Sequence, residues 1–541
     1  MTHMTIPTQA QPTAEAASGA PSRIGRIAAA LVGLAVVAAA VGLAELVAAI
    51  GSYFNAVTSA TSASPLNGLG ATFIQFTPEW LKQFAIAQFG TNDKVALRVG
   101  MGITLIILAA VIGVIARSKP LIAQALFVVL GVVTVIAILT RTGAGPADAI
   151  PTILGIAAGV VLLRKVLSPD KDATVAADTG PNRRRFVQLA TGSAGLAVAS
   201  GVLSRVIPTS AAAEASRKSA AAETASIGGA SLDKMKALPA GYQLDNAGVV
   251  SFVTPNTDFY RIDTAITVPR LDANTWELKI TGMVENPITI TYKDLLDRPL
   301  IERMITLTCV SNEIGGELVG NAKWQGARLA DILAEAKPMA GADMVMSRSS
   351  DGMEIGSPLA VLLEKDRDAI LAVTMNDEVL PFEHGFPVRM VVPGLYGYVS
   401  ATKWVVELEV TKYSDQKAYW TNRGWGEMGP IKTANRIDTP KSFQKLPAGK
   451  FAIGGIAWHQ HLGISKVEVQ IDGGEWMEAK ISTEVTIDTW RQWSYVWDAT
   501  PGQHTIKSRA TDSKGEVQTE SVAGVLPDGA TGYDSRFVTV T

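Results

Sequence analysis

The sequence predicts a multi-domain protein: an all-α membrane anchor of about five spans, then an α+β domain, then a C-terminal β-sandwich. Three observations support this order. Apolar runs crowd the first third of the chain, strands and short helices alternate through the middle, and short strands at regular spacing fill the end. At 541 residues the chain has room for three or four domains, at roughly 150 residues each.

The composition indicates that part of the chain lies in a membrane and argues against a nucleic-acid partner. Only 18% of the residues are charged, against roughly 25% in ordinary soluble proteins, and the mean hydropathy is positive. Part of the chain therefore belongs in a membrane. The net charge is −2 and the pI is about 6.3, so no basic field attracts nucleic acid, and we exclude that partner. A single cysteine allows no internal disulfide and does not indicate the redox compartment.

The membrane anchor is predicted at residues 23–167, after a disordered tail at 1–22. Four uncharged apolar runs lie within it, and a helix needs about 20 apolar residues to cross a bilayer. The runs are Ile27–Ala44, Val99–Ala116, Pro120–Thr140 and Ala149–Leu163. Basic residues concentrate before the first run, between the second and third, and after the fourth. The positive-inside rule therefore places the N-terminus and the exit of the fourth span in the cytoplasm.

Residues 168–207 contain Asn182-Arg-Arg-Arg-Phe-Val-Gln188 and then a weakly apolar run to Ser204. Three arginines before an apolar run suit the cytoplasmic anchor of a fifth span. The order R-R-x-F-V-Q also resembles a twin-arginine export signal, whose pathway carries folded domains. Cleavage at Ala211-Ala212-Ala213 would detach the rest of the chain from its spans. We therefore predict an uncleaved fifth span in the cell membrane, a linker at 208–231, and the remaining domains on the extracytoplasmic side.

Local patterns predict the elements beyond the linker. Trp276–Gly282 alternates as a strand, and Tyr292–Leu296 and Leu329–Ala336 favour short helices. From Lys432 the chain becomes a series of short strands with an Asp472-Gly473-Gly474 hairpin turn. These strands are expected at Phe451–Trp458, Lys466–Ile471, Gln492–Trp497 and His504–Ala510. Their regular spacing predicts a β-sandwich of immunoglobulin type.

The only cysteine, Cys309, follows the alternating run Ile305–Thr308 and precedes Val310-Ser311-Asn312 and two glycines. This pattern predicts a thiol at a strand end. Three interpretations are open: a small buried hydrophobic residue, a nucleophile that needs a nearby base, and a ligand for a soft transition metal. One protein thiolate suffices for the last if a cofactor supplies the other ligands.

A second segment, Pro381–Glu407, combines His384, Arg389 and Lys403, which together suit an anionic ligand. These segments resemble the sulfite oxidase family of molybdenum-pterin enzymes over about residues 240–541. His384-Gly-Phe-Pro-Val-Arg389 and Lys403-Trp404 resemble the family's cofactor clamp. Cys309-Val-Ser-Asn312 resembles its C-x-G-N signature, with serine in place of glycine.

The resemblance implies a sulfite-oxidase-type molybdopterin domain at 232–431 and an immunoglobulin-like dimerisation domain at 432–541. It implies Mo-molybdopterin, with one molybdenum per chain and Cys309 as its metal ligand. Arg389 and Lys403 would clamp the pterin phosphate, and His384 would donate to the cofactor. The residues implied for cofactor binding are Asn256, Tyr260, Arg261, Cys309, Asn312, Ser349, His384, Arg389, Ala401, Thr402 and Lys403.

The substrate prediction follows from departures within the resemblance. Trp425 stands where sulfite oxidases place a tyrosine that helps to hold the anion, and an indole can only donate a hydrogen bond. The loop 397–403 is one residue longer than the sulfite oxidase pattern and lacks its arginine. Tyr396-Gly397 resembles the periplasmic methionine sulfoxide reductases. With Cys309, Arg261, Arg423 and Trp425 as the catalytic set, we expect oxygen-atom transfer involving a small-molecule or protein oxide. Sulfite dehydrogenation and a non-catalytic exported binding or assembly module are the alternatives.

The electron partner is expected to be a separate molecule. No span contains a histidine, and one cysteine provides neither a C-x-x-C-H site nor a cysteine-held iron–sulfur cluster. We therefore expect no haem or iron–sulfur cluster in this chain, and a membrane or periplasmic cytochrome or quinone-linked subunit as partner. His459, His461 and His504 lack a metal-binding pattern and are expected at the surface. A homodimer through the C-terminal domain is a further expectation.

Overall fold

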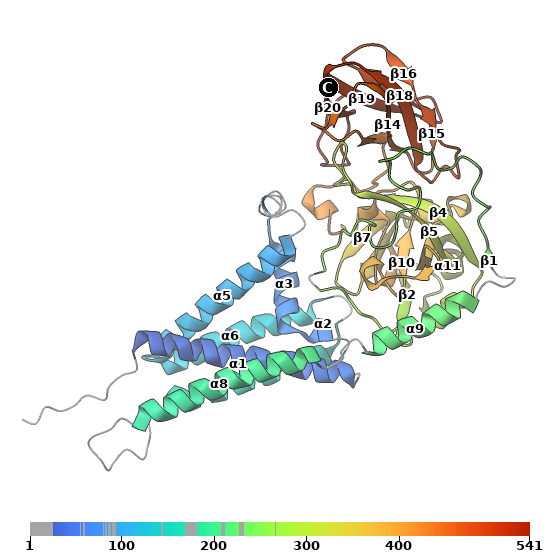
Figure 1. Ribbon diagram of the computed structural model, residues 1–541. Coiled ribbons are helices and arrows are strands. Elements are labelled where there is room, and N and C mark those ends of the chain that lie inside the picture. The colour runs from blue at the N-terminus through green and yellow to red at the C-terminus, as the bar shows by residue number, and fades with distance from the viewer. Residues whose placement is uncertain are drawn as a thin grey trace, which may run out of the picture.

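The computed structural model describes residues 25–54, 56–57, 60–78, 81, 84, 88, 93–141, 144–167, 181–206, 211–226, 232–265 and 267–541. Figure 1 shows a helical bundle at one end, a β-rich domain in the middle and a second β-rich domain at the C-terminal end. The N-terminal tail at 1–22, the residues 168–180 and parts of the expected linker at 208–231 lie outside the described residues.

Four helices of the bundle are long and apolar enough to cross a membrane: Arg26–Tyr53, Ala96–Ala116, Pro120–Leu139 and Pro146–Lys165. They coincide with the four predicted apolar runs. The helical elements are α1 (Arg26–Tyr53), α2 (Ala60–Ala63), α3 (Pro65–Phe76), α5 (Asp93–Ala116), α6 (Pro120–Leu139), η2 (Pro146–Ala149), α7 (Ile150–Leu167), α8 (Pro181–Val206) and α9 (Ala211–Ser226).

Helix α1 packs against α5, α7 and α8, and glycines allow the closest approaches. A Cβ on Gly33 would lie 2.1 Å from the Ala109 carbonyl oxygen, and a Cβ on Gly113 would lie 2.1 Å from the Ala29 carbonyl oxygen. Small residues at a helix crossing let two backbones touch, which is how apolar helices associate in lipid.

Helix α8 carries the arginine-rich motif in its first turns and lies along α1 (Figure 1). It has 26 residues but is less apolar than the four spans, because serine, threonine and glycine recur along it. The fifth span therefore stays a prediction.

Helix α9 occupies most of the segment expected to be a linker. Its alanine-rich sequence has high helix propensity. It is also docked on the middle domain, because the Arg217 guanidinium donates to the carbonyls of Val379 at 3.0 Å and Leu380 at 2.9 Å. Composition alone suggested a flexible connection, whereas these long-range contacts order it.

The middle domain contains two mixed sheets with short helices at their edges. One sheet has the order β1-β4-β5-β8-β10, with β9 paired to β8, and the other has the order β3-β2-β11-β6-β7. The bounds are β1 (Leu232–Asp233), β2 (Glu277–Gly282), β3 (Ile288–Thr291), α10 (Tyr292–Leu296), β4 (Leu300–Thr308), β5 (Val319–Arg328), α11 (Leu329–Ala336), β6 (Met344–Ser349), β7 (Glu354–Pro358), α12 (Leu359–Leu363), η3 (Lys365–Arg367), β8 (Ile370–Met375), β9 (Glu378–Val379), η4 (Phe382–His384), β10 (Arg389–Val391), η5 (Gly397–Val399), β11 (Val405–Thr411) and η6 (Thr421–Arg423).

The local predictions for this domain are confirmed. The predicted strand lies at β2, and the two predicted helices are α10 and α11. Helix α10 begins with a capping box, in which the Asp294 backbone N–H donates to Thr291 Oγ1 at 3.2 Å and Asp294 Oδ2 accepts from the Thr291 backbone N–H at 3.0 Å.

The C-terminal domain is built from two sheets, with the orders β12-β14-β18-β17 and β13-β20-β19-β15-β16, that share a buried apolar core. The bounds are β12 (Ala434–Thr439), β13 (Lys445–Leu446), β14 (Gly449–Trp458), β15 (Ile464–Ile471), β16 (Trp476–Glu478), β17 (Lys480–Ile481), β18 (Arg491–Ala499), β19 (Gly502–Asp512) and β20 (Asp534–Val540). All four strands predicted here are present. Asp472 and Gly473 both have positive φ, at 50° and 71°, as a two-residue hairpin turn requires.

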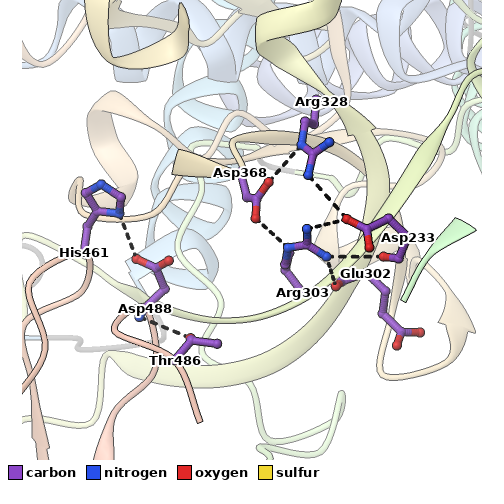
Figure 2. Close-up of polar contacts among 8 residues, drawn as sticks. All are labelled: Asp233, Glu302, Arg303, Arg328, Asp368, His461, Thr486 and Asp488. Atoms are coloured by element: carbon purple, nitrogen blue, oxygen red, sulfur yellow. Dashed lines mark hydrogen bonds and ion pairs between the residues drawn. The ribbon is translucent and has the colours of Figure 1, made fainter. Parts of the chain in front are cut away.

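An ion-pair ring fixes one edge of the first sheet of the middle domain (Figure 2). Arg303 on β4 contacts Asp233 at 2.6 Å and Asp368 at 2.5 Å, and Arg328 on β5 contacts the same carboxylates at 3.4 and 2.8 Å. Each guanidinium lies between two carboxylates. The ring joins β1, β4, β5 and the turn after η3.

Candidate active site

The strand β4 delivers Cys309 to the end of the first sheet, as predicted. Its backbone N–H donates to the Leu318 carbonyl at 2.9 Å, and its own carbonyl accepts from the Asn312 N–H at 3.0 Å. Asn312 Oδ1 accepts from the Leu318 N–H at 2.8 Å, which closes the loop after the cysteine. Cys309 is a free, buried thiol, and burial raises its pKa.

Arg389 is the first residue of β10 and is 5% exposed. Its guanidinium makes long hydrogen bonds to the carbonyls of His384 at 3.3 Å and Met390 at 3.4 Å and lies 5.0 Å from the ring of Trp324. Within the described part of the chain, no carboxylate lies within ion-pair distance of it. Burial lowers its pKa to about 10. A buried cation without a carboxylate indicates an anion that completes the site.

Gly385 brings Arg389 and Lys403 together. It has φ of 110°, and a Cβ there would lie 3.0 Å from the Arg389 Cβ and 3.1 Å from the Lys403 Cβ. A side chain at this position would separate the two cations. Steric crowding therefore explains why the H-G-F-P-V-R motif has glycine at this position.

The ring of His384 is held by the backbone of the 254–261 segment. Its Nε2 lies 2.8 Å from the Asn256 carbonyl, which can only accept, so the ring nitrogen donates. Burial lowers the pKa of His384 to about 4, so the ring is neutral at pH 7 and its other nitrogen is an acceptor. Donation to a cofactor, as the sequence suggested, would need a second proton that this environment disfavours.

Lys403 is paired with a carboxylate that the sequence analysis did not single out. Its Nζ lies 2.6 Å from Asp263 Oδ2, which also accepts from Arg261 Nε at 2.8 Å. Burial lowers the pKa of Lys403 to about 8, although Asp263 opposes this shift. Asp263 therefore offsets part of the positive charge expected to serve an anionic ligand.

The segment 346–353 contributes two groups rather than one. Ser349 lies at the end of β6, and its Oγ accepts from the Asp351 backbone N–H at 3.4 Å. Burial raises the pKa of Asp351. The family resemblance implied only Ser349 in this segment, whereas Ser349 and Asp351 both line the cavity described below. The nearby Thr402 hydroxyl is instead occupied by Ser347 Oγ at 2.6 Å.

Trp425 is 5% exposed, and its Nε1–H has no hydrogen-bond partner among the described residues. It packs against the rings of Tyr398, with centroids 5.9 Å apart, and Trp420, at 6.2 Å. Arg423 does not line the cavity with it; its guanidinium donates to the Tyr419 carbonyl at 2.7 Å and stacks on the Tyr419 ring. The two residues predicted to act together thus lie in different surroundings.

A cavity of about 1610 Å³ brings most of the predicted site residues together. Its walls include Tyr260, Arg261, Cys309, Ser349, His384, Arg389, Ala401, Thr402, Lys403 and Trp425. Three predicted residues do not line it. Asn312 closes the cysteine loop, Arg423 packs on Tyr419, and the Asn256 amide donates to the Met375 carbonyl at 3.2 Å.

The residues present fit a molybdopterin cofactor. A soft thiol at the end of a strand, a buried guanidinium that lacks a carboxylate, and a glycine that clears the space between two cations face one cavity. A thiolate suits a soft transition metal, and a guanidinium suits a phosphate through its planar fork. Fold and site together define a molybdopterin-binding oxidoreductase.

Comparison with known proteins gives the same class. Residues 265–420 match the model of the oxidoreductase molybdopterin binding domain. The chain is 30% identical over 338 residues to sulfite oxidase of Arabidopsis thaliana, which covers 52% of this chain and 86% of that protein. It is 28% identical over 325 residues to mitochondrial sulfite oxidase of Homo sapiens, covering 51% of this chain and 59% of the human protein. The chain belongs to the sulfite oxidase family.

Among solved structures, the sulfane dehydrogenase SoxCD from Paracoccus pantotrophus is similar over 54% of this chain and 82% of its own, at 23% identity and a TM-score of 0.47. The match to the human protein spans only 59% of that protein's length.

Proposed function

We propose that this protein is a membrane-tethered molybdenum-pterin oxidoreductase that acts outside the cytoplasm by oxygen-atom transfer. The observation that carries the proposal is the pairing, in one cavity, of the free Cys309 thiol with the buried Arg389 guanidinium. When bound, the cofactor supplies a metal centre that exchanges one oxygen atom and two electrons with a substrate. The chain supplies the ligand, the phosphate clamp and the pocket.

Each residue has a role that its surroundings support. Cys309 ligates the metal through its sulfur. Arg389 neutralises the pterin phosphate, which would supply the anion that its burial requires. Lys403 adds positive charge next to it, tuned by Asp263. His384 packs at the cavity wall as a neutral ring that donates to the Asn256 carbonyl, and its other nitrogen would accept a hydrogen bond from the cofactor.

The pocket suits an oxide better than a sulfite ion. The Trp425 ring lines the cavity, and its buried Nε1–H has no hydrogen-bond partner among the described residues. A shift of the ring that let a substrate oxygen accept from this N–H would remove the cost of an unsatisfied group. Arg261 and Lys403 are the nearby cations, and both already contact Asp263. Two cations shared with one carboxylate attract a dianion less than two free cations would. We therefore favour reduction of an S-oxide or N-oxide over sulfite oxidation.

The location and the electron partner follow from the anchor. Basic residues on the two sides of the four spans support a cytoplasmic N-terminus and a cytoplasmic exit of the fourth span. A fifth span at α8 would then carry the catalytic domain to the other side. Two electrons per turnover come from a separate membrane or periplasmic cytochrome or quinone-linked subunit. A homodimer through the C-terminal domain, residues 432–541, belongs to the same proposal.

Molybdenum content of the purified full-length protein tests the proposal. The wild type is expected to contain about one molybdenum per chain, and Cys309→Ser is expected to lose it while keeping the circular dichroism spectrum, since the volume change is small. Ser311→Ala is the matched control, because it changes the same loop but keeps the sulfur. A Cys309→Ser protein with full molybdenum and full activity would show that the ligand assignment is wrong.

A further inference from the structure

The membrane helices form one wall of the cavity that holds the site residues. Met101, Thr104, Leu105 and Leu108 of α5 line it, as do Leu69 and Phe73 of α3. The α5 residues recur at helical spacings of three and four and so share one face. There is unfilled space beside this wall. Gly100 lines the cavity, and a Cβ built on it would meet no atom within 4 Å.

Polar contacts join the anchor to the catalytic domain around this cavity. The Thr267 hydroxyl donates to Asn67 Oδ1 on α3 at 3.0 Å. In the loop after α6, burial lowers the pKa of Arg141, and the charge of Asp351 on the catalytic domain opposes that shift. Both catalytic-domain residues line the cavity. The Thr267–Asn67 hydrogen bond joins the anchor to the catalytic domain at the cavity, and the charges of Arg141 and Asp351 favour the same approach.

The cavity therefore has two chemically different ends. At one end lie Cys309, the buried Arg389 and Trp425, whose N–H has no partner among the described residues. At the other end lie leucine, methionine and phenylalanine side chains of α3 and α5, with Arg98 beside them, and α5 is apolar enough to lie in a bilayer. A small polar oxide would fill only the first end and leave the second apolar surface uncovered.

We propose that the natural substrate is an amphipathic, membrane-partitioned oxide: a polar S–O or N–O head group at the Trp425 end and an aliphatic tail along α3 and α5. This inference rests on the proposed function and specifies its substrate class. The head group loses its oxygen, which leaves as water after taking up two protons and two electrons. The electrons come from the cytochrome or quinol partner, and the product is the corresponding sulfide or amine.

Tail length is the variable that tests the inference. Burial of one methylene is worth about a fourfold gain in affinity. Along a series of alkyl methyl sulfoxides, kcat/KM is therefore expected to rise by up to about fourfold per methylene until the tail fills the wall. A site closed off from the helices would show no such rise.

The experiment uses the full-length, molybdenum-loaded protein in detergent with a reduced artificial one-electron carrier and sulfoxides with tails of one to ten carbons. Leu105→Trp fills the wall and is expected to abolish the gain for long tails while leaving the one-carbon substrate unchanged. Ile103→Trp is the matched control, because Ile103 lies on the opposite face of α5, is 54% exposed and does not line the cavity. For each sulfoxide, kcat/KM is compared between variants in the same detergent, so the partitioning of the alkyl tail into detergent micelles cancels in the ratio.

A second readout does not depend on turnover. A long-chain sulfoxide with a photoreactive diazirine at the tail end is expected to label peptides of α3 and α5, and less so in Leu105→Trp. A flat dependence on tail length, or equal effects of Leu105→Trp and Ile103→Trp, would overturn the inference but leave the proposed function standing. Molybdenum-loaded protein that reduces no oxide of any length would instead refute the proposed function.

Discussion

Replacing Arg389 with methionine should stabilise the cofactor-free protein while abolishing cofactor binding. Lowering the pKa of this cation from 12.5 to about 10 corresponds to a cost of about 3 kcal/mol at neutral pH. The lost contact with the Trp324 ring and two long hydrogen bonds return roughly 1–2 kcal/mol of that. The net gain is about 1–2 kcal/mol, or about 4 °C in the melting temperature of the domain.

The assay is thermal unfolding of protein made with and without molybdopterin synthesis in the host. Wild type should melt higher with cofactor than without it, and Arg389→Met should melt at one temperature in both preparations, above that of the cofactor-free wild type. Arg303→Met is the matched control, because Arg303 is a partly buried arginine already held by Asp233 and Asp368 (Figure 2). It should lower both melting temperatures, since Asp233 and Asp368 each lose one of their two arginine partners and keep only Arg328.

The reasoning fails if Arg389→Met lowers the stability of the cofactor-free protein as much as Arg303→Met does. It also fails if Arg389→Met retains stoichiometric molybdopterin. The first result would mean that the protein already compensates the guanidinium, and the second that Arg389 does not hold the phosphate.

Three further predictions follow from the site and the anchor. The pKa of His384 is about 4 in the folded state and 6.5 normally, so the unfolded chain takes up the proton first as the pH falls. The free energy of unfolding should therefore be constant above pH 6.5 and fall by up to about 3 kcal/mol towards pH 4. Urea titrations should find a smaller fall in His384→Phe. Trp425→Tyr should raise the sulfite kcat/KM with an artificial carrier at least tenfold, whereas the distant Trp476→Phe should not change it; efficient sulfite turnover by the wild type would contradict our substrate assignment. Alkaline phosphatase fused after Thr541 should be active, and an inactive fusion would place the catalytic domain in the cytoplasm.

Local pattern predicted much of the chain correctly. Uncharged apolar runs predicted the four long helices, because hydrocarbon accepts only segments without exposed charge. Alternation and turn residues predicted β2, the strands of the C-terminal domain and the hairpin at Asp472. The thiol at the end of β4 was likewise predictable, because the strand and the turn that expose it are encoded by neighbouring residues.

Burial and long-range contacts were decided by the tertiary structure. Asp263 and Lys403 are 140 positions apart in the sequence, and only the folded chain pairs them. The sequence suggested a linker where α9 is docked, since composition does not show that Arg217 finds two carbonyls on another domain.

By itself, the sequence determined the four long apolar helices and the local strands and turns, and its resemblance to the sulfite oxidase family supplied the residues that suit a molybdopterin site. The helices and strands depend on hydropathy and spacing, which act between near neighbours. The tertiary structure alone decided that, among the described residues, buried Arg389 has no carboxylate and the buried Trp425 N–H has no partner, and that α5 forms a wall of the site. Each of these depends on which distant groups exclude water from a residue, and no local pattern in a chain encodes that.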